Sequence, residues 1–126
     1  MRHIESNIQQ ACVTWFRLQF AEYSKLLFAV PNGGARSKIE AARLKAEGVT
    51  AGVTDMILLY PSGYYHSLCI EFKTHNRNSR QSEAQKEWQR AAEEAGNRYV
   101  IVRDFDEFRT AVYEYLYGKN RPIYLT

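Results

Sequence analysis

The chain has few of the residues that form disulfide frameworks or zinc sites. Its two cysteines, Cys12 and Cys69, stand far apart and show no C-x-x-C spacing. This argues against a disulfide framework or a zinc cluster, and it predicts two buried free thiols in a reducing cytoplasm. The three histidines, His3, His66 and His75, show no metal-ligand spacing either.

Long apolar runs are missing as well. No stretch approaches the roughly 18 apolar residues of a membrane span, and residues 1–6 lack the apolar core of a signal peptide. We therefore expect a cytoplasmic protein with no membrane contact. A length of 126 residues fits one domain, so we expect residues 1–126 to form a single domain with 119–126 as a C-terminal tail.

Strong charge of one sign is also absent. The net charge of +3 and the pI of about 8.9 permit a nucleic-acid partner without requiring one. The chain contains no Ser-His-Asp pattern, no phosphate-binding P-loop and no nicotinamide fingerprint, so we expect no nucleotide cofactor.

What the chain does contain is organised around residues 52–73. Two apolar runs flank a Pro-Ser-Gly turn there, which predicts a β-hairpin. The first run is apolar without alternation, as in a strand covered on both faces. The second alternates, so Glu71 and Lys73 point to the same face of a strand that we expect to be largely buried.

The register of this hairpin decides where its charged residues meet. A five-residue loop pairs Tyr60 with His66 and then places Asp55 opposite Glu71, whereas a loop of four or six residues puts the two acids on opposite faces. Directly opposed side chains have Cβ atoms roughly 5 Å apart, and like charges at that distance repel each other. With the five-residue loop, we infer that a cation holds the two carboxylates together.

The other elements are predicted from apolar periodicity, capping residues and glycines. A helix is expected over residues 3–23, with an apolar stripe of Ile4, Ile8, Ala11, Trp15 and Leu18. The further elements, in order, are a strand over 25–30, a helix over 38–47, the hairpin, a helix from 83 to 95, a strand over 98–103 and a helix from 105 to 117.

This order predicts an α/β sandwich with a mixed sheet and helices on both faces. The strand over 98–103 is expected to lie parallel to the Glu71 strand, because a right-handed crossover through a helix joins them.

Asp55, followed on the next strand by Glu71-Phe72-Lys73, resembles the signature of the PD-(D/E)XK nuclease superfamily. Residues 3–117 more closely resemble one branch, the virus-type replication-repair nuclease (VRR-NUC) domain of the stand-alone phage or bacterial type. Thr54 stands where the superfamily label has proline, a departure that is common in this branch. The resemblance also rests on Glu5, Asn32-Gly33-Gly34, Gly52-Val53-Thr54-Asp55 and the segment from Gln81 to Trp88.

The resemblance implies a restriction-endonuclease-like α/β/α sandwich and a metal-dependent endonuclease. Asp55, Glu71 and the backbone carbonyl of Phe72 would bind Mg²⁺ or Mn²⁺, which suits their hard oxygen atoms. Lys73 would orient the attacking water or stabilise negative charge on the phosphate. Glu5 would bind a metal directly or through water.

Two of the implied catalytic residues have a structural alternative. Glu5 sits in the first turn of its helix, where a carboxylate also interacts favourably with the helix dipole. Gln85 either reaches into the active site or bonds back to the backbone of Ser82 as part of a capping box. Both alternatives stay open from the sequence.

Glycines and basic residues on either side of the proposed site predict contacts with DNA phosphates. The alternative is a connecting turn, a solvated helix face and an ordinary exposed loop. The predicted DNA-binding residues are Asn32, Gly33, Gly34, Arg36, Lys38, Arg77 and Arg80.

We therefore expect a structure-selective DNA endonuclease that acts on Holliday junctions, flaps or other branched DNA in replication, recombination or repair. We expect it to act as a homodimer. The alternatives are an endonuclease of restriction or RNA-processing type, and a DNA-binding module that keeps the nuclease fold without activity.

Overall fold

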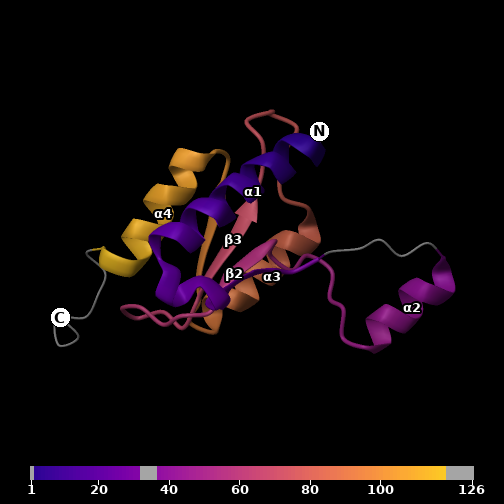
Figure 1. Ribbon diagram of the computed structural model, residues 1–126. Coiled ribbons are helices and arrows are strands. Elements are labelled where there is room, and N and C mark those ends of the chain that lie inside the picture. The colour runs from indigo at the N-terminus through magenta and orange to yellow at the C-terminus, as the bar shows by residue number, and fades with distance from the viewer. Residues whose placement is uncertain (1, 32–36, 119–126) are drawn as a thin grey trace.

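A mixed four-stranded sheet forms the centre of the protein (Figure 1). The computed structural model describes residues 2–31 and 37–118. Across the sheet the strands follow the order β1 (Leu27–Ala29), β2 (Met56–Leu58), β3 (Leu68–Phe72) and β4 (Arg98–Val102). β1 pairs with β2, and β2 with β3, in antiparallel orientation, whereas β3 and β4 are parallel. The predicted mixed sheet and the parallel last strand are confirmed.

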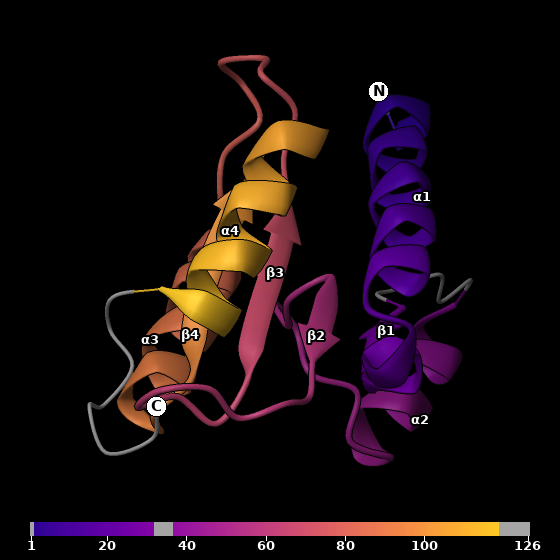
Figure 2. The same cartoon turned by 60° about the vertical axis from the view of Figure 1, so that its left-hand side comes forward.

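Helices cover both faces of this sheet. Helices α1 (Arg2–Gln19) and α4 (Phe105–Tyr117) lie on one face, and α3 (Glu83–Glu94) lies on the other (Figures 1 and 2). The predicted α/β/α arrangement is therefore confirmed. Helix α2 (Lys38–Ala46) has no buried residue and projects sideways from the sheet (Figure 1). In the described ranges no helix has both the length and the apolar character needed to cross a membrane.

Two apolar clusters hold these layers together. The larger one joins α1 and α4 to the sheet, and the smaller one joins α3 to the opposite face. Central members of the larger cluster are Cys12, Phe16, Met56, Ile70 and Phe108. The smaller cluster is formed by Cys69, Ala92 and Tyr99, with Trp88 and Ile101 packed against them. Both cysteines are free and buried, as expected from the sequence.

The register of the hairpin is the one predicted, although its turn is different. Ile57 pairs with Cys69, so continuing the ladder by one step beyond Met56 and Ile70 brings Asp55 beside Glu71. The turn itself is tighter than a five-residue loop, because Ser62 and Tyr65 form a bridge around it. Three residues, 59–61, connect β2 to this turn, whereas two residues, 66–67, connect the turn to β3. This difference of one residue compensates for the tighter turn and gives the predicted register.

The apolar stripe predicted for the first helix is wrong in part. Its core face carries Cys12 and Phe16, whereas Leu18 is 80% exposed. The helix ends at Gln19, and a 3-10 helix (Ala21–Leu26) follows it before β1 begins. Phe16 packs against Phe20, which follows the helix, with ring centroids 5.2 Å apart, and Trp15 of the predicted stripe is only partly buried against the same cluster. The buried face is therefore rotated towards Cys12 and Phe16.

Candidate functional site

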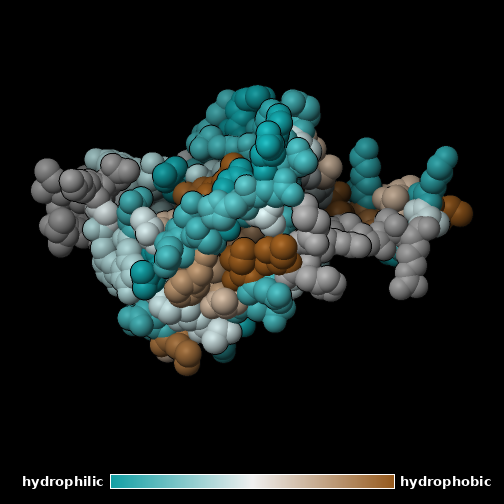
Figure 3. All heavy atoms as spheres, turned by 90° about the horizontal axis from the view of Figure 1, so that it is seen from above, coloured by the Kyte–Doolittle hydropathy of each residue, from teal (hydrophilic) through white to brown (hydrophobic). Residues whose placement is uncertain are grey.

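The candidate site lies at the end of the sheet where β3 finishes. The start of α1 lies at the same end (Figures 1 and 2). Seen from this end, the surface is largely hydrophilic, with a few apolar side chains between the polar ones (Figure 3). Phosphate groups bind at polar surfaces of this kind, so the location is compatible with a nucleic-acid partner.

Two hydrogen bonds attach the Asp55 segment to β3. The buried hydroxyl group of Thr54 donates to the carbonyl oxygen of Ile70 at 2.6 Å. The backbone N–H of Phe72 donates to Oδ2 of Asp55 at 2.7 Å. One oxygen of the Asp55 carboxylate is thus fixed by the neighbouring strand, which sets the direction of the other.

Gly52 brings the start of α3 against this segment. Its φ of +82° is a left-handed conformation that favours glycine. A Cβ atom added there would lie 2.3 Å from the carbonyl oxygen of Ala84. Both the positive φ and the close approach of the two backbones therefore require glycine at position 52. The close approach places Gln85 next to the Asp55 segment.

Glu71 is the most unusual residue of the site, because it is a carboxylate with only 1% of its surface exposed. Its Oε1 accepts a hydrogen bond from the hydroxyl group of Tyr99. Its Oε2 is buried and has no hydrogen-bond partner within residues 2–31 and 37–118. Nζ of Lys73 lies 3.4 Å from Oε2, as an ion pair without hydrogen-bond geometry. A buried charge is costly unless it is paired or binds a metal.

Lys73 and Gln85 meet beside this carboxylate. Nζ of Lys73 donates to Oε1 of Gln85 at 3.2 Å. The same oxygen accepts the backbone N–H of Ser82 at 2.8 Å, and the Ser82 hydroxyl group accepts the N–H of Gln85. The capping-box interpretation of Gln85 is therefore confirmed. The side chain also contacts Lys73, and its catalytic role stays a prediction.

Burial and the neighbouring charges of the site change the pKa of Asp55. Burial raises this pKa above its ordinary value of 3.8, and the negative charges of Glu71 and Glu5 raise it further. The hydrogen bond from Phe72 and the charge of Lys73 act in the opposite direction. Glu5, half-buried in the first turn of α1, is thus close enough to interact electrostatically with Asp55.

These residues fit a divalent cation. Asp55 and Glu71 each have one oxygen anchored by a hydrogen bond, and Oε2 of Glu71 is a buried acceptor that has no donor among the described residues. Hard oxygen atoms with unsatisfied negative charge are the ligands that Mg²⁺ and Mn²⁺ take in proteins. The carbonyl of Phe72 and the carboxylate of Glu5 remain predicted additional ligands.

A second group of potential ligands has a structural explanation. Ligand atoms of His75, Asp104 and Glu107 lie within 4.8 Å of one another. Asp104 caps α4 by accepting the N–H of Glu107, and Glu107 accepts the N–H of Arg103. His75 lies 2.9 Å from Asp104. These carboxylates are satisfied and partly or fully exposed, unlike that of Glu71.

The predicted DNA-contacting residues are only partly described. Arg77 and Arg80 are exposed on the loop that follows Lys73, and Lys38 is exposed at the start of α2. Arg103 donates to the carbonyl oxygens of Thr74 and Ser79, which attaches this loop to the end of β4. Asn32, Gly33, Gly34 and Arg36 lie outside the described residues.

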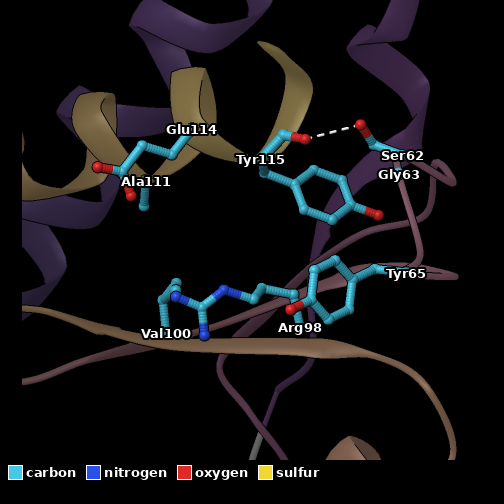
Figure 4. Close-up of a pocket in the computed structure, with 8 residues that line it drawn as sticks. All are labelled: Ser62, Gly63, Tyr65, Arg98, Val100, Ala111, Glu114 and Tyr115. Carbon is cyan, nitrogen blue, oxygen red and sulfur yellow. Dashed lines mark hydrogen bonds between the residues drawn. The ribbon is translucent and has the colours of Figure 1, made fainter. Parts of the chain in front are cut away.

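Two hollows differ in their relation to the site. A groove of about 700 Å³ runs between α2 and the start of α3, and Gly52, Ser82 and Gln85 line it. A pocket of about 50 Å³ lies at the opposite end of β4, between Arg98 and the Tyr115 region of α4 (Figure 4). The small pocket has room for water only, so the groove beside Gln85 is the better candidate for substrate contact.

Tyr99 is the site residue that the sequence analysis missed. It lies on β4 beside Cys69 of β3, so it shares the face of the sheet that carries Glu71. The alternation of the strand over 98–103 could have revealed this face, but only with the parallel register known. Its burial and its hydrogen bond to Glu71 both raise the pKa of the Tyr99 hydroxyl group, which therefore remains a donor.

The fold and the arrangement of acidic residues define the protein as an α/β nuclease-fold protein. A solved structure described as a VRR_NUC domain protein is similar to this chain, with a TM-score of 0.77 and 26% sequence identity. The alignment covers 94% of this chain and 96% of that one. The resemblance to the VRR-NUC domain is thereby confirmed over nearly the whole chain. No family model and no curated protein matches the chain.

Proposed function

We propose that this protein is a Mg²⁺- or Mn²⁺-dependent DNA endonuclease whose catalytic site is formed by Asp55, Glu71 and Lys73. The observation that carries the proposal is the buried Glu71 carboxylate. Its Oε2 accepts no hydrogen bond from the described residues, and the hairpin register places it next to Asp55. A fold built only for stability gains nothing from two neighbouring carboxylates with limited hydration.

Each residue has a role that follows from its position. Asp55 and Glu71 would hold the cation, with the Phe72 carbonyl and Glu5 as predicted further ligands, Glu5 directly or through water. A divalent cation bound there would supply activation of water and neutralisation of charge on the phosphoryl oxygens. The ammonium group of Lys73 donates a hydrogen bond to Gln85. In this position Lys73 would orient the attacking water or stabilise negative charge on the phosphate.

The substrate follows from the surroundings of the site. Arg77, Arg80 and Lys38 would bind phosphates on either side, together with Asn32, Gly33, Gly34 and Arg36. The nuclease fold shared with a VRR_NUC domain protein supports DNA as the substrate. We propose selectivity for junctions, flaps or other branched structures in replication, recombination or repair.

Residues 1–126 would then act as one nuclease domain. We propose that two copies form a homodimer through α4, whose Tyr113 and Tyr117 are exposed, and through the predicted tail of residues 119–126, which lies outside the described residues. A two-fold dimer presents two sites to a symmetric branched substrate. Sedimentation at micromolar concentration, with and without junction DNA, measures this association, and a monomer under both conditions refutes it.

Cleavage assays test the activity directly. Labelled four-way junction, flap, linear duplex and RNA substrates are incubated with Mg²⁺ or Mn²⁺, beside an Asp55→Asn control. We expect metal-dependent cuts in branched DNA by the parent protein and none by the variant. Cleavage of RNA instead favours an RNA-processing enzyme, and DNA binding without cleavage favours an inactive nuclease-fold module.

A further inference from the structure

Both oxygens of the Glu71 carboxylate are connected to α3 through other side chains. Oε2 lies by Lys73, which donates to Gln85 in the first turn of α3. Oε1 accepts from Tyr99, whose hydroxyl group accepts Nε2 of Gln81 at 3.3 Å. One carboxylate is therefore held from two sides by groups that have different chemistry.

Gln81 is itself held in place. Gln81 precedes the N-cap of α3, and its Nε2 also donates to Oε1 of Gln89, a residue of α3, at 2.8 Å. The chain of contacts from Gln89 through Gln81 and Tyr99 thus ends on Glu71. Because the Tyr99 hydroxyl group receives a hydrogen bond from Gln81, its own proton is directed to the carboxylate.

The ring and the hydroxyl group of Tyr99 make different contacts. The ring of Tyr99 packs in the smaller apolar cluster, with its centroid 6.1 Å from that of Trp88. A phenylalanine would fill the same space. The buried oxygen is tolerated only because it is hydrogen-bonded, and its acceptor is the carboxylate of the candidate site.

We propose that Tyr99 is a positioning residue: its hydroxyl group fixes the rotation of the Glu71 carboxylate, so that Oε2 stays directed to the cation. This inference rests on the proposed function, since it assumes that Glu71 is a metal ligand. Groups that hydrogen-bond to a metal-ligating carboxylate orient it, and their removal typically weakens metal affinity or activity by about 10- to 100-fold.

The test compares Tyr99→Phe with Tyr115→Phe. Tyr115 is also a buried tyrosine whose hydroxyl group donates to a protein oxygen, the carbonyl of Tyr60, at 2.6 Å. It lies in the larger cluster on the other face of the sheet. Each variant removes one buried hydroxyl group. Tyr99→Phe loses the hydrogen bond to Glu71 and the one from Gln81, whereas Tyr115→Phe loses the hydrogen bond to Tyr60, so only Tyr99→Phe removes a contact to Glu71.

Two measurements are made on each full-length protein. Mn²⁺ affinity is obtained from the electron paramagnetic resonance signal of free Mn²⁺, without substrate. Cleavage of junction DNA is measured across a Mn²⁺ titration. For Tyr99→Phe we expect the dissociation constant for Mn²⁺ to rise by about 10- to 100-fold, with cleavage restored at high Mn²⁺. Tyr115→Phe should match the parent in both.

Mn²⁺ also stabilises the folded state by mass action, so both measurements are made well below the melting temperature of each variant in EDTA, where restoration by Mn²⁺ reports on the site and not on folding. Unchanged affinity and an unchanged Mn²⁺ requirement in Tyr99→Phe overturn the proposal, as does a loss of cleavage that saturating Mn²⁺ does not restore. If Tyr99→Phe does not fold, Gln81→Leu replaces it and should shift Mn²⁺ affinity in the same direction; no shift overturns the proposal. If the parent protein binds no Mn²⁺, the proposed metal site itself is refuted. The parent alone shows this result, so it is distinct from a failure of the Tyr99 inference.

Discussion

The side chain of Asp55 accepts a hydrogen bond from the backbone N–H of Phe72, the residue that follows Glu71, with a distance of 2.7 Å. This contact crosses from one arm of the hairpin to the other at the point where the ladder ends. An asparagine amide oxygen can accept the same hydrogen bond. Asp55→Asn therefore removes the charge while it keeps the local geometry.

We expect Asp55→Asn to be as stable as the parent, or more stable, at pH 7 in EDTA. Burial and the Glu71 and Glu5 charges raise the folded-state pKa of Asp55 above its ordinary value of 3.8. The ionised form thus costs stability, and this cost is absent below 3.8 and grows as the pH rises through the folded-state pKa. The advantage of the variant should shrink towards about pH 4, as urea unfolding at several pH values would show. A strongly destabilised variant at pH 7 would assign Asp55 a structural role.

Lys73→Met should abolish cleavage while the protein keeps a stabilising response to Mn²⁺. Lysine is not a metal ligand, and methionine retains the apolar stem of the side chain. Without metal the variant should lose about 1–3 kcal/mol, because Oε2 of Glu71 then has no cation beside it. Thermal melts in EDTA and in Mn²⁺ measure both effects. Loss of the Mn²⁺ response would mean that Lys73 is needed for metal binding.

Gln85→Glu and Ser82→Ala separate the two roles of Gln85. Glutamate at position 85 can still accept the N–H of Ser82 and is favourable near a helix N-terminus, but it adds a further negative charge to the site that contains Asp55, Glu71 and Glu5. We expect normal stability and impaired cleavage. Ser82→Ala should lose about 0.5–2 kcal/mol of stability through the missing cap, with cleavage retained well below the melting temperature. Equal losses of cleavage in both variants would contradict this division.

Gly52→Ala should cost more stability than Gly48→Ala and should also reduce cleavage. Both glycines have positive φ, so alanine at either position carries a backbone penalty of roughly 1–2 kcal/mol. A Cβ atom at Gly48 meets nothing within 4 Å, whereas one at Gly52 overlaps the backbone of Ala84. Chemical denaturation and cleavage assays compare the two. Equal stability losses and unchanged cleavage would show that the start of α3 can shift freely.

Replacing Arg77 and Arg80 together by alanine should weaken DNA binding for all sequences and flatten the dependence of affinity on salt. Fewer phosphate contacts release fewer counterions, and each lost contact reduces the slope by roughly 0.9 for duplex DNA. The control replaces Arg90 and Arg109, two exposed arginines on α3 and α4, and so changes the net charge equally. Equal slopes for both double variants would mean that the loop after Lys73 makes no specific phosphate contact.

Much of the fold was accessible from local patterns. The alternation over 68–72 predicted the buried strand, and Ser82 and Asp104 marked the starts of α3 and α4 as N-caps. These features depend on neighbouring residues, so sequence reasoning reaches them. The stripe of the first helix was wrong in part, because the helix turns Cys12 and Phe16 towards the core. Apolar residues also lie on its other faces, so periodicity alone does not specify this rotation.

The sequence by itself determined that Lys73 shares the face of Glu71, because strand geometry has a period of two. It left the position of Asp55 dependent on the length of the hairpin loop, and the structure brought Asp55 beside Glu71 through a tighter turn with unequal arms. Only the tertiary structure decided that Tyr99 donates to Glu71 and that Gln85 holds Lys73 while it caps α3. Those contacts join β3 to α3 and β4, the helix and the strand of the crossover that follows it. Their register is set by the burial of whole side chains between layers, which no local pattern specifies.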